Sequence, residues 1–82
     1  MNDEEIVAAL GACRGRPAVE IAELLGSLAP GGLSQGAIVT YFKRAFPAIP
    51  LRVLLEAGGW SRVGGGTLGD AELNELLRPW IG

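Results

Sequence analysis

The sequence predicts an all-α fold, a compact antiparallel bundle of five to six short helices, and two observations support this. Apolar residues recur at the i, i+3, i+4 and i+7 spacing of one helix face in five successive segments. Proline, glycine and capping residues separate these segments, and no segment alternates apolar and polar residues as a half-buried strand would. Short connections favour antiparallel neighbours around one core. We therefore expect residues 1–82 to form a single helical domain.

The first predicted helix covers residues 3–13. Asn2 and Glu5 have the spacing of a capping box, in which each side chain satisfies the other residue's backbone N–H. Gly15 ends this helix unless Gly11 has already done so. Its predicted inner face consists of Ile6, Ala9, Leu10 and Cys13.

The second predicted helix begins at Pro17, because proline suits the first turn, and it ends before Pro30 and the two glycines that follow. The third has Ser34 as its N-cap and stops before Pro47, which lacks the N–H that a helix needs. The apolar stripes of these two helices are Ile21, Leu24, Leu25 and Leu28, then Ile38, Tyr41, Phe42 and Ala45.

Pro50 opens a fourth predicted helix, and the glycines at 58 and 59 offer it a C-terminal cap. The segment 60–63 adds an extra turn or a short sixth helix, and the glycines at 64–66 form a flexible connecting loop. The residues of the fourth helix that we expect to face inward are Leu51, Leu54 and Leu55.

The last predicted helix covers residues 70–81. With Gly69 as the N-cap, Leu68 and Leu73 take the positions of a hydrophobic staple. Pro79 falls in the final turn, where we expect it to end or kink the helix. The apolar stripe consists of Leu73, Leu76, Leu77 and Trp80.

Catalytic and metal-binding chemistry lack their usual parts in this sequence. The chain has no histidine and one cysteine, Cys13, so a serine or cysteine nucleophile has no imidazole base and a zinc site has too few ligands. The glycines at 64–66 lack the Lys-Ser/Thr pair of a phosphate-binding loop. We therefore expect no enzymatic activity, no metal and no cofactor, and a structural role for Cys13.

The composition also bears on the location of the protein. A single cysteine cannot form an internal disulfide and suits a reducing compartment. The N-terminus lacks the basic and then apolar pattern of a signal peptide, and no apolar run approaches the roughly 20 residues that span a bilayer. We expect a cytoplasmic protein with no membrane partner.

The charges are distributed unevenly along the chain. Residues 1–33 have a net charge of −3, residues 34–66 of +3, and residues 67–82 of −2. One interpretation is an ordinary mixed surface. The other is a domain with opposed patches, which favours head-to-tail contacts between copies and builds rings or filaments. The interface residues predicted on this basis are Lys43, Arg44, Arg52 and Arg62 on the basic side and Glu20, Glu23, Asp70 and Glu72 on the acidic side.

A helix-turn-helix DNA-binding domain over residues 21–46 is an alternative, in which Lys43 and Arg44 would contact phosphate. The connection at 27–32 is longer than the three- or four-residue turn of that motif. The net charge of −2 also argues against nucleic acid, which we do not expect as a partner. A small antitoxin or immunity protein with one tight partner is the remaining alternative.

The segments 41–47, 51–55 and 70–77 of this helical chain resemble the death-fold superfamily. They are most similar to bacterial death-like, CARD-like or effector-associated adaptor domains. The resemblance implies a six-helix bundle with Greek-key connectivity, whose homotypic association recruits an effector in anti-phage defence. Together with the charge layout, it predicts a protein–protein interaction module whose partners are like domains and which can form a homo-oligomer.

Overall fold

A computed structural model of the chain describes residues 2–63 and 66–81, and these residues form five helices around one apolar core. This confirms the predicted all-α bundle. The predicted loop at 64–66 lies outside the described residues except for Gly66. The helices are α1 (Asp3–Gly11), α2 (Ala18–Leu28), α3 (Gln35–Ala45), α4 (Leu51–Ala57) and α5 (Asp70–Ile81).

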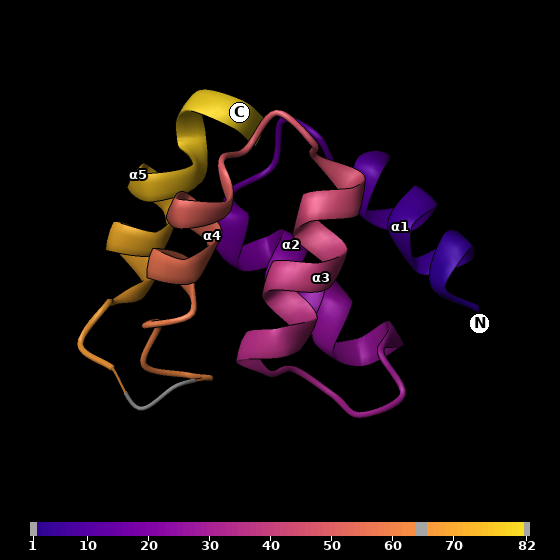
Figure 1. Cartoon of the computed structure of the whole chain (residues 1–82), viewed down its shortest axis with the longest axis horizontal. Coiled ribbons are helices and arrows are strands. Elements are labelled where there is room, and N and C mark those ends of the chain that lie inside the picture. The colour runs from indigo at the N-terminus through magenta and orange to yellow at the C-terminus, as the bar shows by residue number, and fades with distance from the viewer. Residues whose placement is uncertain (1, 64–65, 82) are drawn as a thin grey trace.

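Helix α3 packs against both α1 and α4, and α2 packs against α5 (Figure 1). The C-terminal end of α5 lies beside the connection between α1 and α2, where the Gly15 N–H donates to the Ile81 carbonyl at 2.7 Å. Every helix contributes buried side chains, and so do three residues outside the helices, Phe46, Ile49 and Trp60. The largest fully buried side chains include Trp60, Phe42, Phe46, Ile6 and Leu10.

The N-terminus of α1 has the predicted capping box. The Glu5 N–H donates to Asn2 Oδ1 at 2.9 Å, and the Asn2 N–H donates to Glu5 Oε1 at 3.4 Å. The helix ends at Gly11, the earlier of the two predicted endings, and does not extend to Cys13. The Cys13 N–H donates to the Leu10 carbonyl, three residues back, so the chain tightens into turns before Gly15 reverses it with a φ of 98°.

The N-terminus of α2 is capped by a residue from another helix. Helix α2 begins at Ala18, one residue later than predicted, and Pro17 is its N-cap. Proline has no side-chain oxygen that could accept a backbone N–H of the first turn. Asn74 of α5 takes over this task, because its Oδ1 accepts the N–H of Val19 at 2.8 Å. This hydrogen bond caps the first turn of α2 and links α5 to it.

The residues from which the two ends of α3 were predicted, Ser34 and Pro47, do determine them. Ser34 is the N-cap, as predicted, and its Oγ accepts the Ala37 N–H at 3.1 Å. The helix ends at Ala45, and Phe46 leaves the helical region with φ −131° and ψ 72°. The residue before a proline is pushed out of the α region, so Pro47 determines this ending.

The inward face of α4 differs from the prediction. Leu51 is 52% exposed and Leu55 is 61% exposed, so the expectation that both face inward is wrong. Apolar residues occupy more of this seven-residue helix than one face can bury, and the flanking residues decide its rotation. Ile49 and Trp60 are both fully buried on either side of it. Their burial leaves Val53, Leu54 and Ala57 facing the core.

The connection between α4 and α5 contains no sixth helix in its described part. Residues 60–63 form a turn, and Trp60 pairs with Leu68 in an isolated parallel bridge. The Ser61 N–H donates to the Leu68 carbonyl at 2.9 Å, so it is not available for a helical bond to the preceding turn. Gly66 lies directly against the backbone of Gly59 in this arrangement.

Helix α5 covers Asp70–Ile81, as predicted, and it continues through Pro79, so Pro79 does not end it. Proline removes one helical N–H near the end of the helix, where few backbone bonds remain to be made. The last residue is held by other contacts. The Ile81 side chain is buried in the core, and its carbonyl accepts the N–H of Gly15.

We predict that Gly66→Ala destabilises the domain by about 1 to 3 kcal/mol, the usual range for overpacking. A Cβ at this position would lie 2.8 Å from the carbonyl carbon of Gly59 and closer still to its oxygen. Gly31→Ala is the matched control, because a Cβ there meets nothing within 4 Å. Denaturant unfolding followed by circular dichroism measures both. Equal stability of the two variants would contradict the close approach.

We also predict that Asn74→Ala lowers the free energy of unfolding by about 1 kcal/mol, because α2 loses its N-cap acceptor. Asn74→Asp retains an oxygen that can accept the Val19 N–H, and we expect it to keep most of the stability. The same unfolding measurement tests both variants. If Asp is as destabilising as Ala, the side-chain oxygen is not what stabilises α2.

Candidate interaction surface

Three of the predicted interface residues meet in one cluster beside Trp60. Arg62 Nη2 lies 3.2 Å from Glu23 Oε2, and Arg62 Nη1 lies 3.6 Å from Asp70 Oδ2. The Arg62 guanidinium also stacks over the Trp60 ring, with its carbon 4.8 Å from the ring centroid. The indole N–H of Trp60 donates to Asp70 Oδ1 at 2.8 Å. We call these four residues the Trp60 cluster.

The Trp60 cluster joins charges that the sequence predicted for opposite patches. Arg62 was assigned to the basic side, and Glu23 and Asp70 to the acidic side, but one molecule pairs them internally. The side chains are 42–56% exposed, so each ion pair contributes little alone. Their combined effect is to fasten the α4–α5 connection to α2 and to reduce the charge available to a partner.

Tyr41 and Arg44 of α3 both contact Asp3 at the start of α1. The Tyr41 hydroxyl donates to Asp3 Oδ1 at 2.7 Å, and Arg44 Nη1 lies 3.8 Å from Asp3 Oδ2. The hydrogen bond to the carboxylate raises the pKa of Tyr41 above its ordinary value, and partial desolvation and the negative charge of Asp3 act in the same direction. Arg44, a predicted interface cation, thus stabilises the α1–α3 contact.

Lys43 is also engaged within the chain. Its Nζ donates to the carbonyl of Pro47 at 3.1 Å and to that of Ile49 at 2.7 Å. These carbonyls follow the end of α3, where a cation is favoured by the helix dipole. In the helix-turn-helix alternative Lys43 and Arg44 would contact phosphate, but in this structure both side chains bind their own chain.

Two of the predicted acidic residues have local partners. Glu20 Oε1 lies 3.5 Å from Arg16 Nη1, one helical turn away. Glu72 Oε1 accepts the Gly69 N–H at 3.3 Å, as the third helical residue of a capping box does. Both side chains are exposed, so these weak local contacts leave their charges accessible.

Arg52 differs from the other predicted cations, because it forms no ion pair and no hydrogen bond with residues 2–63 and 66–81. It is exposed on α4, between Leu51 and Leu55. These leucines are the large apolar side chains that stand exposed in the described part of the chain. We call Leu51, Arg52 and Leu55 the α4 ridge.

Sequence reasoning found Arg52 but missed both leucines, which it assigned to the core. The signal that identifies them is an excess of apolar residues in a short helix. Five of the seven residues of α4, Leu51, Val53, Leu54, Leu55 and Ala57, are apolar. A short helix on a surface buries a stripe and not its full circumference, so some of these five had to remain in solvent.

A shallow depression on α5, widely open to solvent, carries both apolar and acidic side chains. It has a volume of about 460 Å³, and we call it the α5 groove. Leu68 and Leu76 are partly buried against the core and form its apolar part, while Glu72 and Glu75 are exposed. The residues that line it are Leu68, Ala71, Glu72, Glu75 and Leu76.

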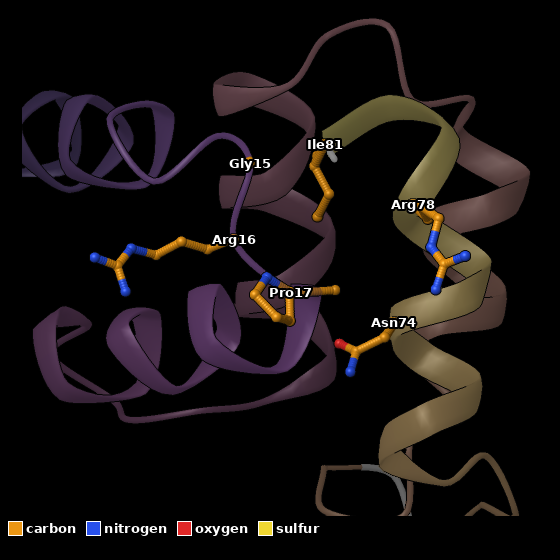
Figure 2. Close-up of a pocket in the computed structure, with 7 residues that line it drawn as sticks. Gly15, Arg16, Pro17, Asn74, Arg78 and Ile81 are labelled. Carbon is orange, nitrogen blue, oxygen red and sulfur yellow. The ribbon is translucent and has the colours of Figure 1, made fainter.

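A smaller cavity, of about 190 Å³, lies between the α1–α2 connection and α5 (Figure 2). Arg16 and Arg78 line it, but their guanidinium groups point away from each other in Figure 2. Arg16 pairs with Glu20, and Arg78 pairs with Glu75. The Asn74 oxygen at this cavity accepts the Val19 N–H. The two guanidinium groups therefore do not point to one position in the cavity, as they would in a site that binds an anion.

Residues 2–63 and 66–81 contain no group of three or more His, Cys, Asp or Glu side chains that could hold a metal ion. Over the same residues, no helix has the length and apolar character needed to cross a membrane. A comparison of the chain with protein families, curated proteins and solved structures finds no match.

We predict that the pKa of Tyr41 lies above 10.0 and falls in the Asp3→Ala variant, because the phenol loses its acceptor and the nearby negative charge. Tyr41 is the sole tyrosine, so phenolate absorbance reports it directly. Glu4→Ala removes the same charge from the same helical turn and serves as the control. Since the folded-state pKa is raised, the stabilisation is present below pH 10 and is lost as the pH rises through the folded value.

Proposed function

We propose that this chain is a protein–protein interaction module that associates with domains like itself and recruits an effector, without catalytic activity of its own. The observation that carries the proposal is the α4 ridge. Two leucines, each more than half exposed, stand one helical turn apart around an exposed arginine. Adjacent exposed apolar groups on a small domain are typical of a surface that is covered by a partner.

The charges of the ridge and of α5 support association between like domains. Lys43, Arg44 and Arg62 bind groups of their own molecule, whereas Arg52 stands on the ridge. Glu72 and Glu75 are exposed on α5 of the same chain. One molecule thus presents both an accessible base and accessible acids, which is the requirement for a head-to-tail contact between copies.

The resemblance of segments 41–47, 51–55 and 70–77 to bacterial death-like, CARD-like or effector-associated domains supports the same function. In this proposal the module acts in the cytoplasm, in anti-phage defence, with the Greek-key connectivity that the resemblance implies. The turn at 60–63 occupies the place where the sixth helix of that arrangement was expected.

We predict that the purified chain self-associates as its concentration rises, and that added salt weakens this association because ion pairs contribute to it. Sedimentation velocity over a range of protein and salt concentrations measures both effects. A chain that remains monomeric at all concentrations, and captures no domain of its own kind when immobilised, would overturn the proposal. Capture of one tight, unlike partner would instead favour an antitoxin or immunity protein.

A further inference from the structure

We propose that copies of this domain join by placing the α4 ridge of one molecule in the α5 groove of the next. The inference rests on the proposed homotypic association and names the two surfaces that carry it. The ridge is Leu51, Arg52 and Leu55. The groove is lined by Leu68, Ala71, Glu72, Glu75 and Leu76.

The side-chain rows of the two surfaces have the same spacing. Leu51 and Leu55 form an i, i+4 row on α4, and both side chains are more than half exposed. On α5, Ala71 and Glu75 form one i, i+4 row, and Glu72 and Leu76 form the next. Rows of this kind on two helices interdigitate with their axes crossing at about −50°. Ala71 has the smallest side chain of the residues that line the groove.

The contact would remove apolar groups of both surfaces from water. Leu55 is 61% exposed, and the groove has Leu68 and Leu76 in its lining. Burial of such groups is favourable in proportion to the apolar area that is covered. Within one molecule, the described residues leave the ridge leucines more than half uncovered, so a partner is needed to complete their burial.

The charges of the two surfaces are complementary. Arg52 lies on the ridge, and Glu72 and Glu75 lie along the groove. Glu75 already contacts Arg78 of its own helix, and both side chains are more than 60% exposed. Because exposed pairs of this kind are weak and exchange readily, Glu75 remains able to bind Arg52 of another copy. Such pairs determine register and orientation more than affinity.

A second copy is the occupant that satisfies all of these observations, because one sequence contains both the ridge and the groove. A single ridge–groove contact leaves one ridge and one groove unused. The unused pair either closes a ring, including a reciprocal dimer, or continues an open chain. Either outcome makes the assembly depend on both surfaces of every internal molecule.

The first experiment uses one variant for each surface. Leu55→Asp places a charge on the ridge, and Ala71→Arg fills the groove. We expect each to raise the dissociation constant for self-association at least tenfold in sedimentation velocity. Arg16→Glu and Ala8→Arg change exposed residues outside both surfaces and serve as controls with unchanged association. Circular dichroism and thermal unfolding confirm that each variant is folded.

The decisive experiment mixes the two variants. Leu55→Asp keeps an intact groove and Ala71→Arg keeps an intact ridge, so a one-to-one mixture should form a dimer that grows no further. A mixture that stays monomeric, or a single variant that associates like the wild type, would overturn the ridge–groove contact.

A charge exchange tests the ion pair itself. Arg52→Glu should weaken association at least tenfold, and adding Glu75→Arg to the same chain should restore most of it. A double variant no better than Arg52→Glu alone would show that these residues do not meet. A monomeric wild-type chain would overturn the homotypic function, whereas an associating wild type with unaffected variants would overturn the ridge–groove contact alone.

Discussion

The indole N–H of the buried Trp60 needs an acceptor, and Asp70 at the edge of the core provides it. Trp60 is fully buried, and an unsatisfied N–H there would cost the full desolvation of the group. Asp70 accepts the hydrogen bond at the start of α5, where the helix dipole also favours a carboxylate. Arg62 then covers the ring and balances the charge. Through Glu23 it extends this arrangement to α2, so three parts of the fold meet at one side chain.

This use of charge within the molecule changes the meaning of the uneven charge distribution. A net charge of +3 in the middle of the chain suggested a broad basic patch. Folding instead distributes those cations among different tasks: Arg62 at the Trp60 cluster, Arg44 at α1 and Lys43 at the end of α3. The surface left for a partner is the short α4 ridge, which consists of two exposed leucines and one arginine. In the proposed contact the leucines contribute buried apolar area, and Arg52 determines the orientation of the partner.

The positions of the helices were predicted well, because the caps and breaks that define their ends depend on residues close together in the sequence. Asn2 and Ser34 cap their own helices within three residues, and both caps were predictable. Two features depended instead on tertiary structure. The rotation of α4 is set by buried residues on either side of it, which exposed Leu55 against the prediction. The cap of α2 comes from Asn74, 55 residues beyond Val19, and no local pattern connects the two.

The cap that Asn74 provides has a consequence for folding during synthesis. Helix α2 leaves the ribosome long before α5. Until Asn74 of α5 is in place, the Val19 N–H in the first turn of α2 can bond only to water. Isolated helices of this length are marginal in water, so α2 should fray while the chain is incomplete. The order of emergence therefore delays the final structure of the domain until α5 has left the ribosome. The interaction surfaces of this domain are therefore complete only after α5 has packed against α2.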